Sequence, residues 1–285
     1  MKIGITAATG QLGAAILSQM IERLGGNHVV AIARSPHKLS NQKIESRQGD
    51  YDQPNELVAA FQSLDTVMLI SGNAPPEIRL QQHLNIIEAA VTADVKKVVF
   101  SGILVEGHAE GFRAALDVSL ATEKALINGG LQWVIGRNGI YLDPDLEYID
   151  AYIKEGRVSN CAGDGKCAYT ARSELAIAYA YLLTNESMNG KIYNLVGESI
   201  TQQQLTDYIN DFFGVNLSYE SMSVEAYRQN RIQAFNSDMF GNIIAGIYEN
   251  IRNGGFDADS DYARVTGRPH KTIRELFASF KDSQT

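Results

Sequence analysis

Short apolar runs alternate with amphipathic segments along the first half of the chain. An apolar run at Lys2–Thr6 is followed by apolar residues at helical spacing from Leu12 to Leu24, and a second run covers His28–Ala33. Apolar residues spaced three and four apart predict an amphipathic helix, whereas a short continuous run predicts a strand that is buried on both faces. The first segment of the chain therefore predicts one β-strand–helix–β-strand unit.

The same alternation continues to about residue 135. We predict further strands over residues 43–48, 67–70, 98–100 and 131–135, and helices over residues 55–63, 76–93 and 113–128. Strands that alternate with helices predict a parallel sheet covered on both faces, and right-handed crossovers make the doubly wound topology the simplest one. The expected fold class is therefore α/β, with a Rossmann domain over residues 1–140.

After about residue 140 the pattern changes. Helices are expected over residues 145–154 and 173–184, a strand over 191–196 and a short strand over 217–219. Two capping boxes, Thr201–Gln204 and Thr272–Glu275, predict the starts of two further helices. We expect residues 173–196 to return to the sheet, and residues 141–285 to form a smaller, mostly helical C-terminal lobe that contacts the substrate.

Composition and charge narrow the class of protein. The chain has 25 Lys and Arg against 33 Asp and Glu, which gives a net charge of −8 and argues against nucleic acid as a partner. No apolar run approaches the length of about 18 residues that a membrane helix needs, so no membrane insertion is expected. Cys161 and Cys167 have no histidine nearby, which predicts two reduced thiols, no metal site and a cytoplasmic protein.

The turn after the first predicted strand has the spacing of a dinucleotide-binding loop. It reads Ala7-x-x-Gly10-x-x-Gly13, with alanine in place of the first glycine. Such glycines let the backbone turn tightly and approach a pyrophosphate, which then binds the N–H groups at the start of the following helix. The alternative is a turn that no longer binds a nucleotide, because the methyl group of Ala7 narrows the site or requires a different φ.

The end of the second predicted strand indicates which nicotinamide cofactor fits. A carboxylate at this place binds the ribose 2′-hydroxyl of NAD, whereas an arginine accommodates the 2′-phosphate of NADP. The chain has Arg34 here and no carboxylate, with Lys38 close behind. This pattern favours NADP(H), and the alternative is an arginine that only meets solvent.

Six motifs in order resemble those of the NmrA-like atypical short-chain dehydrogenases, and within them the bacterial NADPH:quinone oxidoreductase 2 type. They are Ile5–Gly13, Ala31–Pro36, Gly49–Asp52, Arg137–Tyr141, Ala162–Lys166 and Thr170–Arg172. The resemblance implies that NADP(H) binds along one edge of the fold. It implies a pyrophosphate cradle of Ala7, Ala8, Thr9, Gly10, Gln11 and Leu12, a 2′-phosphate contact at Arg34, adenine contacts at Asp50 and Tyr51, central contacts at Ser71 and Gly72, and a nicotinamide border of Asn138, Gly139, Ile140 and Tyr141.

The usual catalytic acid of short-chain dehydrogenases is missing. Those enzymes use a Tyr-x-x-x-Lys pair, but the residue four positions before Lys124 is Leu120, and none of the 13 tyrosines has a lysine four positions later. Ser101 matches a polar position of the superfamily but has no tyrosine partner. We predict that Lys124 holds the nicotinamide ribose, the alternative being a lysine that only meets solvent on its helix. Asn138, or its neighbour Tyr141, is expected to assist the proton transfer.

The missing acid favours a quinone-type acceptor. Hydride addition to a quinone gives a weakly basic hydroquinone anion, whereas a ketone gives a strongly basic alkoxide that needs an acid. We therefore expect an NADPH-dependent quinone reductase. A non-enzymatic NADP(H)-binding redox sensor that acts on a partner protein and a degenerate fold that binds no dinucleotide are the alternatives, and the apolar helix faces leave a homodimer open.

Overall fold

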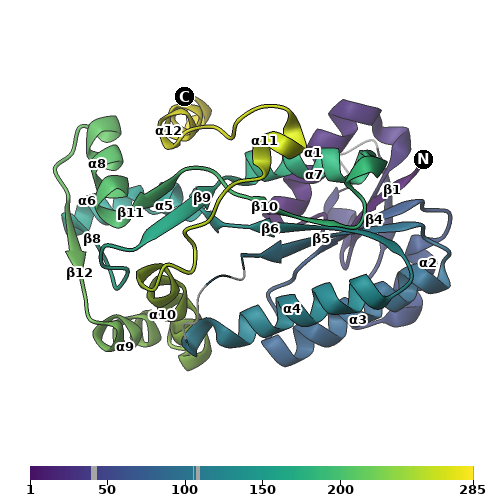
Figure 1. Ribbon diagram of the computed structural model, residues 1–285, viewed down its shortest axis with the longest axis horizontal. Coiled ribbons are helices and arrows are strands. Elements are labelled where there is room, and N and C mark those ends of the chain that lie inside the picture. The colour runs from purple at the N-terminus through teal and green to yellow at the C-terminus, as the bar shows by residue number, and fades with distance from the viewer. Residues whose placement is uncertain (40–43, 105, 107–109, 285) are drawn as a thin grey trace.

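The computed structural model describes residues 1–39, 44–104, 106 and 110–284. Within these residues, the main sheet has seven parallel strands in the order β10-β6-β5-β4-β1-β2-β3 (Figure 1). The strands are β1 Ile3–Ile5, β2 Val29–Ala33, β3 Glu45–Gln48, β4 Thr66–Ile70, β5 Lys97–Ile103, β6 Gln132–Asn138 and β10 Lys191–Leu195. The predicted doubly wound sheet is confirmed, although Lys43, the expected start of the third strand, lies outside the described residues.

Helices cover both faces of this sheet (Figure 1). Every residue of β1, β2 and β4 is buried, as expected for continuous apolar runs in a parallel sheet. One face is covered by α1 Gln11–Leu24, α7 Arg172–Thr184 and α11 Tyr262–Thr266. The other face is covered by α2 Pro54–Phe61, α3 Pro76–Thr92 and α4 Arg113–Asn128. These layers hold the carboxyl ends of the strands together at one edge.

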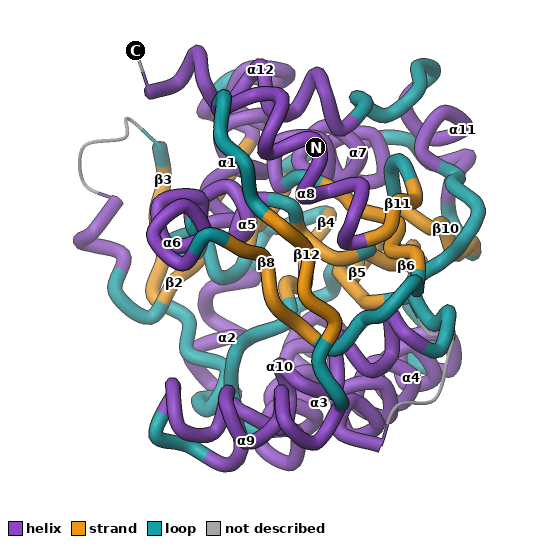
Figure 2. Tube along the Cα trace, turned by 90° about the vertical axis from the view of Figure 1, so that its left-hand side faces the viewer, coloured by secondary structure: helices purple, strands orange, loops and turns teal. Residues whose placement is uncertain are grey.

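A second apolar cluster lies in the C-terminal half, beyond that edge. It includes a three-stranded sheet β11-β9-β7 and a two-stranded sheet β12-β8, whose strands lie side by side in Figure 2. The strands are β7 Ile140–Tyr141, β8 Arg157–Asn160, β9 Lys166–Thr170, β11 Ser199–Thr201 and β12 Ser218–Ser221. The helices are α5 Asp143–Glu147, α6 Ile149–Glu155, α8 Gln202–Phe213, α9 Val224–Phe235, α10 Asp238–Arg252 and α12 Ile273–Gln284.

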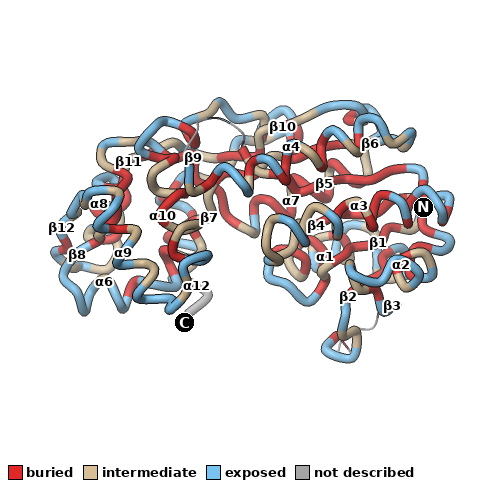
Figure 3. The backbone as a smooth tube through the Cα atoms, turned by 90° about the horizontal axis from the view of Figure 1, so that it is seen from below, coloured by how far each residue is buried: buried red, intermediate tan, exposed pale blue. Residues whose placement is uncertain are grey.

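The two halves share elements. Figure 3 shows buried segments running along the sheet and also through the C-terminal half. Strand β10 pairs with β6 and helix α7 packs on α1, so the chain re-enters the main sheet after residue 170. The division into two domains at residue 140 stays a prediction.

The helix expected over residues 145–154 is two short helices, because the turn at Tyr148 interrupts it.

Both predicted capping boxes are present. The Thr201 hydroxyl accepts a hydrogen bond from the Gln204 N–H, and the Gln204 side chain accepts one from the Thr201 N–H. In the second box the Glu275 N–H donates to the Thr272 hydroxyl at 3.3 Å, and the Thr272 N–H donates to the Glu275 carboxylate at 2.7 Å.

Within the described part of the chain, no helix is both long and apolar enough to cross a membrane.

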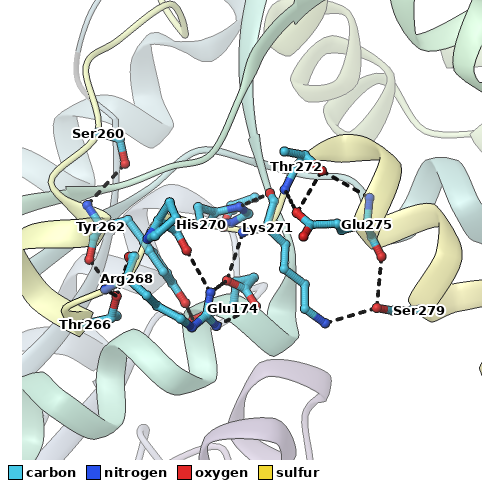
Figure 4. A network of polar contacts seen from close by, with 12 residues as sticks. Glu174, Ser260, Tyr262, Thr266, Arg268, His270, Lys271, Thr272, Glu275 and Ser279 are labelled. Atoms are coloured by element: carbon cyan, nitrogen blue, oxygen red, sulfur yellow. Dashed lines mark hydrogen bonds and ion pairs between the residues drawn. The ribbon is translucent and has the colours of Figure 1, made fainter.

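The last segment of the chain is held against α7 by the buried carboxylate of Glu174, which is 1% exposed. Arg268 donates to both carboxylate oxygens at 2.8 and 2.9 Å, and the Lys271 N–H donates at 3.2 Å (Figure 4). Burial opposes ionisation, but the hydrogen bonds from Arg268 and Lys271 hold the pKa of Glu174 below its usual value. We call Glu174, Arg268 and Lys271 the C-terminal anchor.

Candidate functional site

A cavity of about 840 Å³ opens at the carboxyl ends of the main strands. Its lining comes from the turns after β1, β2, β3 and β4, from the ends of β5 and β6, and from the first turns of α1, α3 and α7. In doubly wound sheets ligands bind at this edge, where the strand order reverses. Here the reversal is at β1, which has β2 on one side and β4 on the other.

The turn from Ala7 to Gly13 forms the floor of the cavity. Ala7 has φ of 47°, in the left-handed region, which costs an alanine about 1–2 kcal/mol. Its carbonyl accepts the Gly10 N–H at 2.8 Å. A Cβ on Gly13 would lie 2.2 Å from that same oxygen, so glycine is required there. The alanine at the first loop position is therefore accommodated in a strained, left-handed backbone conformation.

Helix α1 presents a free N-terminus to the cavity. Gly10 is its N-cap residue and supplies no capping side chain. The first N–H groups of any helix lack partners inside the helix, and they carry the positive end of the helix dipole. Gln11, Leu12 and Gly13 line the cavity at this point. This turn can therefore bind an anion.

Arg34 lies exposed at the tip of β2 and lines the same cavity. No carboxylate pairs with it among the ion pairs of the described residues. Its positive charge is therefore available to a ligand. Asp50, which also lines the cavity, accepts a hydrogen bond from the Asp52 N–H at 3.1 Å.

Tyr51 closes the wall between β1 and β4. Its hydroxyl donates to the Ile70 carbonyl at 3.0 Å and lies 2.7 Å from the Thr6 hydroxyl. Burial raises the pKa of Tyr51. The hydroxyl is therefore a structural group, and Tyr51 also packs against the apolar cluster beneath α2 and α3 while it lines the cavity.

The Ser71–Gly72 turn and Ser101 lie next to each other at the ends of β4 and β5, in the middle of the lining. The Ser101 hydroxyl accepts the Ser71 N–H at 3.2 Å and donates to the Leu69 carbonyl at 3.4 Å. Since Ser101 is buried and holds these two strand ends together, its hydroxyl is occupied by the protein.

The other end of the cavity holds three linked polar side chains. Asn138 is buried; its side-chain N–H donates to the Tyr141 hydroxyl at 3.0 Å, and its carbonyl oxygen accepts from the Tyr179 hydroxyl at 2.7 Å. Burial raises the pKa of Tyr141 to about 12, although Asn138 and Arg172 oppose the shift. Tyr141 is thus protonated at neutral pH, and no acceptor for its hydroxyl hydrogen exists within the described part of the chain.

Arg172 lies beside this end of the cavity. Its guanidinium carbon is 5.6 Å from the centre of the Tyr141 ring. The same guanidinium pairs with Glu147 at 3.0 Å and with Asp143 at 3.6 Å. The charge of Arg172 is therefore balanced inside the protein, and its main effect is to fix the position of Tyr141.

Twelve of the residues predicted for the site do line the cavity. They are Ala7, Thr9, Gly10, Gln11, Leu12, Arg34, Asp50, Tyr51, Ser71, Gly72, Asn138 and Tyr141. Ala8 and Ile140 pack into apolar clusters instead, and a Cβ on Gly139 would lie 2.2 Å from the Ala168 carbonyl. These three residues shape the backbone around the cavity.

Lys124 is not brought to the cavity. Its side chain is exposed on α4 and absent from the lining. The neighbouring residue Glu123 points inward, where Arg137 donates to both of its carboxylate oxygens at 2.9 and 2.7 Å. Because consecutive helical residues point about 100° apart, Lys124 faces away from the sheet. The structure gives the predicted role of Lys124 no support, and Leu120 lies exposed on the same helix.

Sequence reasoning gave several residues of the lining no role, among them Arg79, Gln82, Ile103 and Arg172. Arg79 and Gln82 come from α3, Ile103 ends β5, and Arg172 begins α7. Arg172 belongs to the Thr170–Arg172 motif, which was the one available signal. Tyr179, which fixes Asn138, lies 41 residues further along the chain and had no signal at all.

Asp145 is a buried carboxyl in the C-terminal half, where the Tyr152 hydroxyl donates to it at 2.8 Å. Burial raises its pKa to about 6 from an ordinary 3.8. A carboxyl whose pKa is raised by folding stabilises the fold below pH 3.8. This contribution to the free energy of unfolding is lost as the pH rises through about 6. At pH 8 the ionised form costs about 3 kcal/mol, since one pKa unit is about 1.4 kcal/mol.

Asp145→Asn should therefore be increasingly stabilising relative to the natural protein as the pH rises. We expect a gain of up to about 3 kcal/mol in the free energy of unfolding at pH 8 and almost none at pH 4. Urea unfolding at both pH values measures this difference. Asp150→Asn, at an exposed position, is the control. An equal effect of Asp145→Asn at both pH values would show that the carboxyl is not protonated by burial.

Cys161 and Cys167 are free and buried, as two reduced thiols were expected to be. Burial raises the pKa of Cys161 to about 11 and raises that of Cys167 as well. The thiolate is the reactive form of cysteine, so neither residue is a nucleophile at neutral pH.

The lining fits a phosphorylated dinucleotide. The lining includes an uncapped helix N-terminus, a loop whose shape requires glycine at Gly13, and Arg34, which has no carboxylate partner among the described residues. The cavity volume lies within the range of small-molecule and cofactor sites. The donor set therefore matches pyrophosphate at α1 and a 2′-phosphate at Arg34, which is the arrangement of NADP(H).

Comparison with known proteins agrees with this geometry. Residues 7–185 match the NAD(P)H-binding family. The chain is 31% identical over 279 residues to quinone oxidoreductase 2 of Escherichia coli, with 96% of each chain covered. It is 30% identical over 299 residues to the NmrA-like family domain-containing oxidoreductase flvB of Aspergillus flavus, which covers 99% of this chain and 97% of that protein.

Solved structures show the same fold. The Citrobacter sp. triphenylmethane reductase complexed with NADP(H) has a TM-score of 0.89 and 29% identity, and covers 98% of this chain and 100% of that one. The NADPH-dependent quinone oxidoreductase of Escherichia coli complexed with NADPH has a TM-score of 0.86 and 30% identity, and covers 98% and 99%.

Proposed function

Because the chain belongs to the NAD(P)H-binding family and is a homologue of NmrA-like oxidoreductases, we propose that it transfers hydride from NADPH to a quinone-type acceptor. One observation carries this proposal. The cavity has groups suited to anionic phosphates at one end, and at the other the neutral hydroxyl of Tyr141, which has no acceptor among the residues that the structure describes.

The first end holds the cofactor. The N–H groups at the start of α1 bind the pyrophosphate, and Arg34 pairs with the 2′-phosphate. Tyr51 and Asp50 border the adenine, and Ser71 and Gly72 border the central part. When bound, NADPH supplies the hydride, and the protein supplies position and exclusion of water.

The second end receives the acceptor. Asn138 donates to the Tyr141 oxygen, so the Tyr141 hydrogen is directed to another acceptor, for which we propose an oxygen of the quinone. Tyr179 fixes the Asn138 amide, and Arg172 lies over the Tyr141 ring. With its pKa near 12, Tyr141 is a weak acid that donates a hydrogen bond and lets water deliver the proton.

The assay that tests the function follows NADPH oxidation with a panel of benzoquinones, ketones and aldehydes. We expect quinone reduction and negligible ketone reduction, because no Tyr-x-x-x-Lys acid is available for a basic alkoxide. NADPH binding without turnover of any acceptor would assign the chain to the sensor alternative. Absence of NADPH binding would leave only the degenerate fold.

Arg34→Asp should change the cofactor preference. The variant places a carboxylate beside the 2′-phosphate, so NADPH affinity should fall by about 10- to 150-fold, the effect of a charge-assisted contact, while NADH affinity changes less. Fluorescence titration with both nucleotides measures the two affinities. Lys154→Asp, at an exposed position on α6 outside the lining, is the matched charge control. Equal losses for both nucleotides would contradict the assignment.

Tyr141→Phe should have a small effect on quinone reduction. General acid catalysis typically contributes 10²–10⁴-fold, but a weakly basic hydroquinone anion does not need it, so we expect a loss in kcat of roughly tenfold or less. The measurement is steady-state NADPH oxidation with one benzoquinone, together with NADPH affinity. A loss of about a thousandfold would mean that Tyr141 is an essential acid and that the acceptor is a more basic carbonyl.

The two buried, unpaired thiols support the further proposal of a reducing, cytoplasmic setting. The predicted homodimer stays a prediction.

A further inference from the structure

Arg79 is a second arginine of the cavity lining that has no carboxylate partner in the part of the chain that the structure describes. It lies on the first turn of α3, is half-buried and lines the cavity with Gly72 and Gln82. Its Nε and Nη2 donate to the Ala74 carbonyl at 3.0 and 2.7 Å. These two bonds fix the guanidinium plane to the backbone just after β4 and leave Nη1 without a partner among the described residues.

Arg79 differs from other half-buried arginines. Arg137 pairs with Glu123, Arg172 with Glu147 and Arg268 with Glu174. No carboxylate among the described residues pairs with Arg79, although burial lowers its pKa and thus disfavours its charge. A half-buried cation at a cavity wall is stabilised when an anion enters the cavity.

The sheet topology indicates which anion this is. Helix α1 follows β1 on one face of the sheet, and α3 follows β4 on the other face (Figure 1). Since β1 and β4 are neighbours, the first turns of α1 and α3 flank the crevice at which the strand order reverses. Arg34 lies at β2, on the opposite side of β1. Arg79 is therefore placed on the pyrophosphate side of the cavity, away from the 2′-phosphate contact.

We propose that Arg79 binds the pyrophosphate of the dinucleotide from the α3 side, opposite the N-terminus of α1. This inference rests on the proposed function. It divides the cofactor's charge between two arginines, with Arg34 on the 2′-phosphate and Arg79 on the pyrophosphate. Arg34 then determines the choice between NADPH and NADH, whereas Arg79 contributes equally to both.

The test is binding of NADPH, NADH and ADP-ribose, which share only the adenosine, the pyrophosphate and a ribose beyond it. Arg79→Gln should weaken all three by a similar factor of about 10- to 150-fold, the range for a charge-assisted contact. Arg79→Lys keeps the charge and should recover part of the loss. Arg274→Gln, which removes an exposed arginine far along the chain, should leave the three affinities unchanged.

The possible results distinguish a failure of the Arg79 proposal from a failure of the proposed function. Unchanged affinities, with or without a fall in Tm, would mean that Arg79 only caps the Ala74 carbonyl, and the proposal would be wrong. A loss restricted to NADPH would place Arg79 on the 2′-phosphate and would also overturn it. If the natural protein itself binds none of the three nucleotides, the proposed function fails, which is a different result from a failure of Arg79 alone.

Discussion

Gly13→Ala should abolish high-affinity NADPH binding and lower the stability of the fold. The added Cβ would lie 2.2 Å from the Ala7 oxygen, 2.9 Å from the Ala7 carbonyl carbon and 3.1 Å from the Ala8 Cα. All three are backbone atoms, so the whole turn has to move away from α1. Overpacking of this kind costs about 1–3 kcal/mol, and we expect the upper end because no side chain can rotate away.

The measurements are urea unfolding and NADPH titration. Gly10→Ala is the matched control in the same turn, since its Cβ would lie 3.2 Å from the Ala7 oxygen and its φ of −80° suits any residue. We expect it to lose much less stability. Equal effects of the two substitutions would show that the close approach at Gly13 does not determine the shape of the turn.

Arg268→Ala should destabilise the protein by about 3 kcal/mol. Removing one partner of a buried ion pair costs about 3–5 kcal/mol, because the other charge is left buried and unpaired. Glu174 is 1% exposed and Arg268 is 38% exposed, so solvent screens the arginine and favours the lower end of that range. Thermal and urea unfolding at neutral pH measure the loss.

The pH dependence of this loss identifies its cause. A carboxyl whose pKa is lowered by folding stabilises the fold above its ordinary value of 4.5, and this contribution disappears as the pH falls through the lower folded value. The difference between Arg268→Ala and the natural protein should therefore shrink below pH 4.5. Arg264→Ala removes a more exposed pair with Asp261 and should cost at most about 1 kcal/mol. A loss that does not vary with pH would point to packing.

The main sheet was predictable because its strands are buried on both faces. Runs such as Val29–Ala33 and Thr66–Ile70 are apolar at every position or nearly so, and they alternate with helices of ordinary length. The small sheets of the C-terminal half carry no such pattern. Strands β8 and β12 are four residues each and largely polar, and their paired residues, such as Arg157 and Ser218, lie 61 positions apart in the chain. The short strand expected over residues 217–219 overlaps β12, but no local pattern distinguishes β8 from a loop.

The residues of the site differ in the same way: some could be predicted from the local sequence and others could not. Gly10, Gly13 and Arg34 could be identified because their chemistry depends on the turns next to them in the sequence. Arg79 and Tyr179 are brought to the site by the fold, because they lie on helices without a binding motif at these positions. Lys124 was predicted to reach the cofactor, but the residue of α4 that points inward is its neighbour Glu123. The apolar spacing of Leu116 and Leu126 already places Glu123 on the inner face between them, with Lys124 outside it.

The C-terminal anchor has a consequence for the order in which the protein is made. A ribosome releases Glu174 long before Arg268, which is 94 residues further along the chain. All seven strands of the main sheet are present once Leu195 has emerged, so the sheet can assemble during synthesis. Until Arg268 follows, the Glu174 carboxylate lacks its ion-pair partner. Glu174 lies on α7, the helix that also carries Tyr179 and Arg172. The end of the cavity that holds Tyr141 is thus fixed only after Arg268 has emerged, and a chain truncated before Arg268 would keep the sheet but have a loosened α7.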